Sequence, residues 1–279
     1  MLPWVEAAFR WTHVVAGILW IGSLYFFNFV NLQVAKSYDP DSRRKVVPEL
    51  MPRVLYWFRW GAVYTWISGI LLAGLVYYSV DNLVEKDATG AATIPHMAGV
   101  AISLALIGVV FFVYEAVWKA TGKNERVGVG ILYGLFVVLL FGLSRFFTGR
   151  AVFIQAGMLF GTIMVMNVWM RIWPAQKQVL RGVAGVGPAP EPSVPAMAAL
   201  RSKHNTYMSV ALVFTMISNH YPTIYGWENS WLILAATLAL GFAVTKLLYL
   251  KSAGSAPTLY GAPAAVPPAG TPRPAAPKP

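Results

Sequence analysis

The sequence predicts an all-α integral membrane protein, a polytopic bundle of about seven transmembrane helices. Hydrophobic residues make up 57% of the chain and charged residues only 12%, which is about half of the charged share of soluble domains. Apolar runs long enough to cross a bilayer recur along the chain. They are too long and continuous for strands, so helices are expected. Seven segments meet this description: about 4–30, 54–79, 97–119, 128–147, 150–172, 205–225 and 230–250.

The first segment carries an arginine and a histidine inside an apolar run and has no small-residue cleavage site. It is therefore predicted to be a retained helix and not a signal peptide. At helical spacing His13, Gly17 and Trp20 share one face, and Arg10 lies one turn away from His13. Ionisable groups at such depth are costly and usually face the bundle interior. Two interpretations stay open: a polar pair that hydrogen-bonds between helices, and a site where Gly17 lets a flat cofactor approach the backbone.

The third segment, 97–119, follows Pro95 and His96, and proline is well tolerated in a first helical turn. Glu115 falls one to two turns from the other end of this segment. A lone acid at that depth can relay protons, or it can pair with an arginine of a neighbouring helix. Both roles are kept as hypotheses.

The fourth and fifth segments are joined by a very short connection, which predicts an antiparallel helical hairpin. A proline-rich stretch follows, so residues of about 174–204 are expected to form a cytoplasmic linker. The bundle is expected to occupy 1–251, and the Ala/Pro-rich tail 252–279 is expected to be disordered.

The sixth segment begins at a polar run that contains His204 and Asn205, and His220 follows 16 residues later. That spacing corresponds to about 24 Å along a helix. The two histidines are therefore expected near opposite faces of the membrane.

The net charge of +11 is unevenly distributed along the chain. Lysine and arginine concentrate between helices one and two, after helix three, and between helices five and six. This alternation follows the positive-inside rule and predicts an external N-terminus and a cytoplasmic C-terminus. The basic charge thus indicates topology and attraction to the anionic lipid bilayer, and no nucleic-acid partner is expected.

Three of the four histidines, His13, His96 and His220, are predicted to lie in the outer half of the bundle. Two imidazoles from different helices at similar depth are what a low-spin heme b requires. We predict iron ligation by His13 and His220, with His96 as a substitute for either, Gly17 beside the ring and Arg10 at a propionate. The chain has no cysteine, which excludes disulfides, thiolate metal sites and covalently attached c-type heme.

A copper or zinc site is the rival use of these histidines. Such a site needs ligands that converge at about 2 Å from the ion. The sequence contains no short His-x-His or His-x3-His pair, so a site of this kind would have to assemble from distant helices. The remaining alternative is that the histidines are interfacial polar residues.

Three motifs resemble the urate oxidase N-terminal family, the membrane domain of bacterial membrane-bound urate hydroxylases. They are the runs Phe9–Gly22, Arg201–Met208 and Met216–Pro222, and the resemblance extends over roughly residues 4–250. The first run alone is also similar, more weakly, to heme-binding protoporphyrinogen oxidases and to copper-resistance membrane proteins.

The resemblance implies a multi-pass oxidoreductase domain of the bacterial plasma (inner) membrane that passes electrons from a small substrate, such as urate, to a c-type cytochrome. The chain has no Cys-x-x-Cys-His motif, so a separate cytochrome or respiratory-chain subunit is expected as the acceptor. His204, Asn205 and Glu115 are candidates for a second cofactor or quinol site. Two alternatives remain, a non-catalytic membrane subunit of a respiratory complex and a copper-handling membrane protein.

Overall fold

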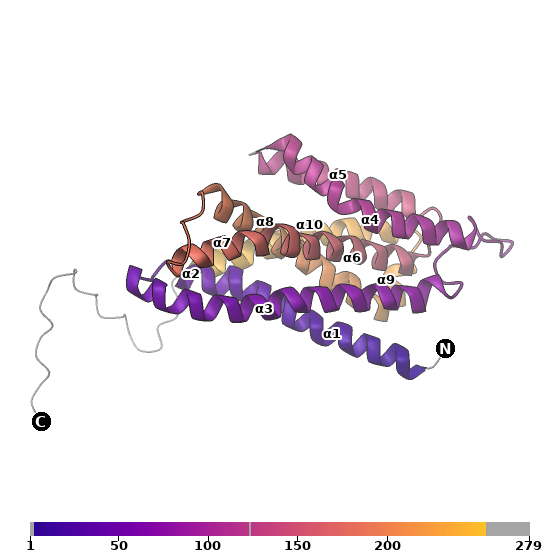
Figure 1. The fold of residues 1–279 in the computed structure, drawn as a ribbon. Helices are drawn as coiled ribbons and strands as arrows, with labels where there is room; N and C mark the ends of the chain where they lie inside the picture. The colour runs from indigo at the N-terminus through magenta and orange to yellow at the C-terminus, as the bar shows by residue number, and fades with distance from the viewer. Residues whose placement is uncertain (1–2, 123, 255–279) are drawn as a thin grey trace, which may run out of the picture.

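The computed structural model describes residues 3–122 and 124–254, which form a bundle of long helices (Figure 1). The elements are α1 (Pro3–Tyr25), η1 (Phe26–Asn31), α2 (Leu32–Val34), α3 (Pro40–Ala73), η2 (Gly74–Tyr78), α4 (His96–Thr121), α5 (Glu125–Leu143), α6 (Gly149–Met166), η3 (Asn167–Ile172), α7 (Trp173–Val183), α8 (Ser193–Ile217), η4 (Ser218–His220), α9 (Pro222–Tyr225) and α10 (Ser230–Ala253). The predicted all-α membrane bundle is confirmed. The disordered tail was predicted for residues 252–279, and residues 255–279 of it lie outside the part of the chain that the structure describes.

Six helical segments of the described chain are long and apolar enough to cross a membrane, one fewer than the sequence predicted. They are Pro3–Val34, Pro40–Tyr78, His96–Thr121, Glu125–Leu143, Gly149–Val183 and Ser230–Ala253. The seventh predicted segment corresponds to α8, which is as long as the others. Its first half carries Arg201, Lys203, His204 and Asn205, and this polarity keeps α8 below the hydropathy of a membrane span.

α6 is the centre of the bundle. α6 belongs to the apolar segment Gly149–Val183, and 83% of the most apolar stretch of this segment is buried inside the protein. In the other five candidate membrane spans the buried share is 17–33%. One part of the core packs Trp20 and Phe58 against Met164, and a second part gathers around Phe153 and Leu140. The other helices surround α6, so their outward faces are left for lipid (Figure 1).

The helices run antiparallel, which places the connections at two ends of the bundle (Figure 1). The end that holds the start of α1 also holds the loop after η2, the α5–α6 connection and α9; we call it the N-terminal end. Two backbone hydrogen bonds join the loop after η2 to the α5–α6 connection. The Glu85 amide donates to the Phe146 carbonyl at 2.9 Å, and the Thr148 amide donates to the Leu83 carbonyl at 3.0 Å. In the same loop Lys86 donates to Asp81 at 2.6 Å and holds the pKa of that carboxyl below its usual value.

Side-chain caps define several helix starts. Asp39 accepts hydrogen bonds from the amides of Asp41 and Ser42 at the start of α3, and Pro40 occupies the first turn. Thr148 accepts from the Ala151 amide at the start of α6.

The connection between the fifth and sixth predicted segments, which the structure places between η3 and α8, is more ordered than predicted. The sequence suggested a linker of about 174–204, but α7 continues to Val183 and α8 already begins at Ser193. α7 is strongly amphipathic, since Ala175 is buried while Arg181 is exposed. Only residues 184–192 connect the two helices without regular structure.

The charge pattern predicts which end faces the cytoplasm, and reporter fusions test it. Fusions after Lys45 and Glu191 are expected to report cytoplasm, and a fusion after Glu85 the exterior. Paired alkaline phosphatase and fluorescent-protein reporters at each position give opposite signals on the two sides. The reverse pattern would place the N-terminal end, with His13, in the cytoplasmic half.

Candidate functional site

His13 is held in a fixed orientation between α1 and α3. Its Nδ1 lies 3.1 Å from Ser68 Oγ, and Ser68 donates its hydroxyl proton to the Tyr64 carbonyl at 2.6 Å. The serine oxygen therefore accepts from the ring, so Nδ1 carries the ring proton. The Nε2 lone pair is left available, which is the tautomer that ligates a metal.

The glycine that makes room for the His13 ring is Gly69, and the sequence did not reveal it. A Cβ at position 69 would lie 3.0 Å from His13 Cε1, tighter than most real Cβ contacts, so the ring would have to shift. Gly17 was predicted to lie beside a cofactor ring. A Cβ there would meet Thr65 at 3.8 Å, an ordinary packing distance.

Arg10 is paired within its own helix. Its guanidinium lies 2.6 Å from Glu6 Oε1, one turn earlier, and both side chains are partly exposed. The sequence suggested that Arg10 neutralises a propionate or an anionic substrate. In the structure its charge is compensated by Glu6.

The two other histidines at the N-terminal end differ in their surroundings. His96 Nε2 lies 2.9 Å from the Tyr78 carbonyl oxygen, which can only accept, so its Nδ1 bears the lone pair. That nitrogen is buried and has no hydrogen-bond partner among the described residues. His220 is exposed in the short turn η4.

No group of three His, Cys, Asp or Glu side chains comes together to hold a metal ion within residues 3–122 and 124–254.

At the opposite end, His204 and Asn205 belong to one buried hydrogen-bonded network. Tyr114 Oη lies 2.7 Å from His204 Nδ1, and Asn167 donates to Tyr114 at 3.2 Å and to Asn205 Oδ1 at 2.9 Å. Asn205 in turn donates to the Met164 carbonyl at 3.0 Å. The network ties α4, η3, α6 and α8 together where they are buried, and single π-helical turns such as η3 are frequent at functional sites.

His204 has one ring nitrogen without a partner. Among the described residues no other acceptor takes the Tyr114 hydroxyl proton, so the hydroxyl donates to Nδ1, and Nε2 carries the proton. Nε2 is buried and unpartnered in this part of the chain. The ring also stacks on Trp118 with 4.2 Å between centroids, so its plane is fixed.

Glu115 lies beside this network in an ion-paired triad. Arg171 contacts Glu115 Oε2 at 2.6 Å and Arg201 contacts Glu115 Oε1 at 2.8 Å. Of the two roles that the sequence left open for Glu115, the structure shows the ion pair. The Arg201 guanidinium also lies over the Tyr114 ring, 4.9 Å from its centroid, which links the triad to the network.

The sequence did not reveal Ser68, Tyr114, Asn167 or Arg201 as site residues. Asn167 was detectable in principle, as one of two side-chain amides, with Gln155, in the apolar run of the fifth segment. Arg201 was interpreted as a topology signal and as part of the run Arg201–Met208 that resembles the family, and not as a site residue. Nothing in the sequence shows that these residues meet, because their separations reach 90 residues, as in the Tyr114–His204 pair.

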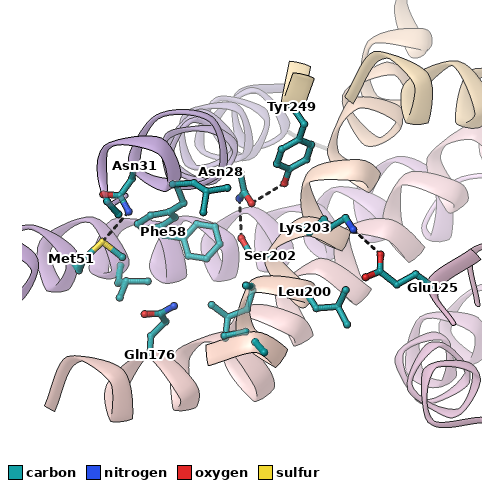
Figure 2. A pocket seen from close by; sticks show the side chains of 18 residues that line it. Asn28, Asn31, Met51, Phe58, Glu125, Gln176, Leu200, Ser202, Lys203 and Tyr249 are labelled. Carbon is teal, nitrogen blue, oxygen red and sulfur yellow. Dashed lines mark hydrogen bonds and ion pairs between the residues drawn. The ribbon is translucent and has the colours of Figure 1, made fainter. Parts of the chain in front are cut away.

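A cavity of about 460 Å³ opens at this same end, on another face of α8. Figure 2 shows its lining: Asn28 bonded to Ser202 and Tyr249, and the Lys203–Glu125 ion pair at one side. The remaining lining is largely apolar and includes Phe58. Gln176 and Asn31 also line it, and Asn31 has only the Met51 sulfur as a partner, at 3.7 Å.

A comparison with protein families gives one match. The family described as urate oxidase N-terminal matches residues 1–46 and 37–267 of the chain. No curated protein and no solved structure matches this chain.

Proposed function

Because this chain belongs to the urate oxidase N-terminal family, we propose that it is the membrane domain of a urate hydroxylase-like oxidoreductase that holds a b heme through His13. In this function the domain takes electrons from a small substrate, with urate the first candidate, and passes them to a separate c-type cytochrome.

The observation that carries the proposal is the fixed tautomer of His13. Its Nδ1–H donates to Ser68, and in heme and metal sites this second hydrogen bond orients the ligating ring and raises its basicity. Gly69 makes room for the Cε1–Nδ1 edge of the ring, the edge that bonds to Ser68. The donor chemistry therefore fits a heme, and in a chain without cysteine an imidazole is the natural ligand.

The second axial ligand is assigned to His220, with His96 as the substitute. Both lie at the same end of the bundle as His13 but on other elements, so the three imidazoles come from different helices or turns. His96 offers a buried Nδ1 lone pair. A heme held in this way supplies one-electron transfer across the membrane domain.

A reduced-minus-oxidised visible spectrum of the detergent-purified chain tests the proposal. We expect a sharp b-type α band after dithionite. Urate is expected to produce the same band, whereas xanthine, a purine without the 8-oxo group, is expected to leave it absent. If no heme signal appears even after reconstitution with heme, the heme proposal is lost and the non-catalytic subunit becomes the better interpretation.

A further inference from the structure

The Glu115 triad carries an uncompensated positive charge inside the bundle. Arg171 and Arg201 both pair with Glu115, so two cations share one carboxylate. Glu125, at the start of α5, is already paired with Lys203 at 2.6 Å. Arg201 is only 8% exposed, and it shares its carboxylate partner with Arg171, so the triad keeps a net charge of +1 next to a buried guanidinium. The triad therefore has the electrostatics of a site that receives an anion.

Unpartnered donors lie at the same place. Arg201 Nε and Nη1, His204 Nε2 and Trp118 Nε1 are all buried and have no hydrogen-bond partner among the described residues. With the His204 tautomer set by Tyr114, all four atoms are N–H donors. Arg201 lies 4.9 Å from the Tyr114 ring centroid, and His204 lies on Trp118, so the donors surround one tyrosine. Two buried acceptors of the same region, Glu115 Oε1 and Asn167 Oδ1, also have no hydrogen bond among the described residues. The four donors outnumber them, and because buried donors are almost always satisfied, the region has donors left for a further acceptor.

We propose that Arg201, His204 and Trp118 bind a small organic anion, a carboxylate or a planar oxo-anion, in the half of the bundle opposite His13. The Arg201 Nε and Nη1 are both unpartnered in the described part of the chain, on either side of the Nη2 that contacts Glu115, so each can donate to an oxygen of an anion. Two sources have this chemistry: urate as the monoanion, and a propionate of a second heme in this half, since the heme proposed at His13 lies at the other end. The choice of these sources rests on the proposed function, but the anion site itself rests on the triad and its donors.

Arg201 is better suited to this role than Arg10. The Arg10 charge is neutralised by Glu6 at the partly exposed start of α1. The triad instead runs from Arg171, whose side chain is 40% exposed, to Arg201, whose side chain is 10% exposed. An anion can thus approach along Arg171 and reach its binding position at Arg201.

Equilibrium dialysis with radiolabelled urate, on the full chain in detergent, tests the site. We expect Arg201→Gln to weaken binding about tenfold to a hundredfold, the usual worth of hydrogen bonds to a charged group. Arg201→Lys keeps the charge but loses the planar array of N–H donors, and a loss of about tenfold is expected. Lys203→Gln is the matched control, because Lys203 is a cation of the same helix that pairs with Glu125 on another side; it should bind as the unchanged protein does.

Glu115→Gln gives a test in the opposite direction. It removes the carboxylate that the two arginines share and leaves a second uncompensated charge, so urate binding is expected to tighten. This variant keeps the proposal testable if Arg201→Gln folds poorly, which the unfolding temperature of each variant will show.

Heme content, measured on the same variants, separates the two sources. If the anion is a propionate, Arg201→Gln loses heme while Lys203→Gln keeps it, and urate affinity does not depend on Arg201. If the anion is urate, heme content stays constant and urate affinity falls. The proposal is overturned if Arg201→Gln and Lys203→Gln match the unchanged protein in both measurements. Urate binding through Arg201 in a chain that holds no heme would leave this site standing and remove the heme proposal.

Discussion

The substitution His13→Ala is expected to abolish the b-type band of the purified chain. It removes the imidazole whose Nε2 lone pair is left free by the hydrogen bond from Nδ1 to Ser68. The side chains that face this part of α1 from α3 are Thr65, opposite Gly17, and Ser68, and neither is a usual heme ligand. The dithionite-reduced minus oxidised spectrum and the extracted heme content measure the effect.

Two further variants show whether the loss is specific. Ser68→Ala keeps the ligand but releases the ring, so we expect heme to be retained with a changed midpoint potential, in line with the effect of second-shell partners. His204→Ala lies in the network at the opposite end and is expected to spare at least one heme signal. A full spectrum in His13→Ala would remove the central residue of the proposed function.

Gly149→Ala is expected to cost the largest amount of stability of any single methyl added to the chain. A Cβ at this position would overlap the carbonyl oxygen of Tyr225 and lie 3.3 Å from Ser230 Oγ. Backbone cannot move aside as a flexible side chain can, so α9 and the start of α10 must shift away from α6. Overpacking of this kind costs about 1–3 kcal/mol, and thermal unfolding followed by circular dichroism in detergent measures it.

Gly161→Ala is the matched control for this prediction. Gly161 lies in the same helix, and a Cβ there has nothing within 4 Å. Alanine is favoured over glycine in a helix interior by up to about 1 kcal/mol, so the control is expected to be as stable as the unchanged protein or more stable. Equal unfolding temperatures for both variants would contradict the packing described between α6 and α9.

The sequence predicted the class of fold because continuous apolar runs are a one-dimensional signal. It also singled out His13, since an ionisable residue stands out in such a run. The partners of His13 were not predictable, because Ser68 and Gly69 lie 55 and 56 positions away and meet it only through the register of α1 on α3. That register depends on how the side chains of the two helices pack, and the hydropathy of the sequence does not predict this packing.

The cluster at the opposite end was predicted only in fragments. His204, Asn205 and Glu115 were singled out one by one as polar residues at the end of apolar segments. Their connection depends on Tyr114 and Asn167, whose side chains join three elements. Tyrosine in a membrane helix is an ordinary interfacial residue, so nothing in the sequence indicates that Tyr114 lies at the centre of this network.

The polarity of α8 has a consequence for how the protein is made. Asn205, Thr206, Ser209 and Thr215 are completely buried in this helix, and their partners lie on α1, η3 and α6 or in α8 itself. A charged residue near a helix centre costs about 2.5–3.5 kcal/mol on insertion from the translocon, and α8 brings Arg201 and Lys203. During synthesis α8 is therefore expected to stay at the membrane surface at first and to insert into the bilayer together with α10. At that point α1 and α6, which supply hydrogen-bond partners for α8, are already inserted.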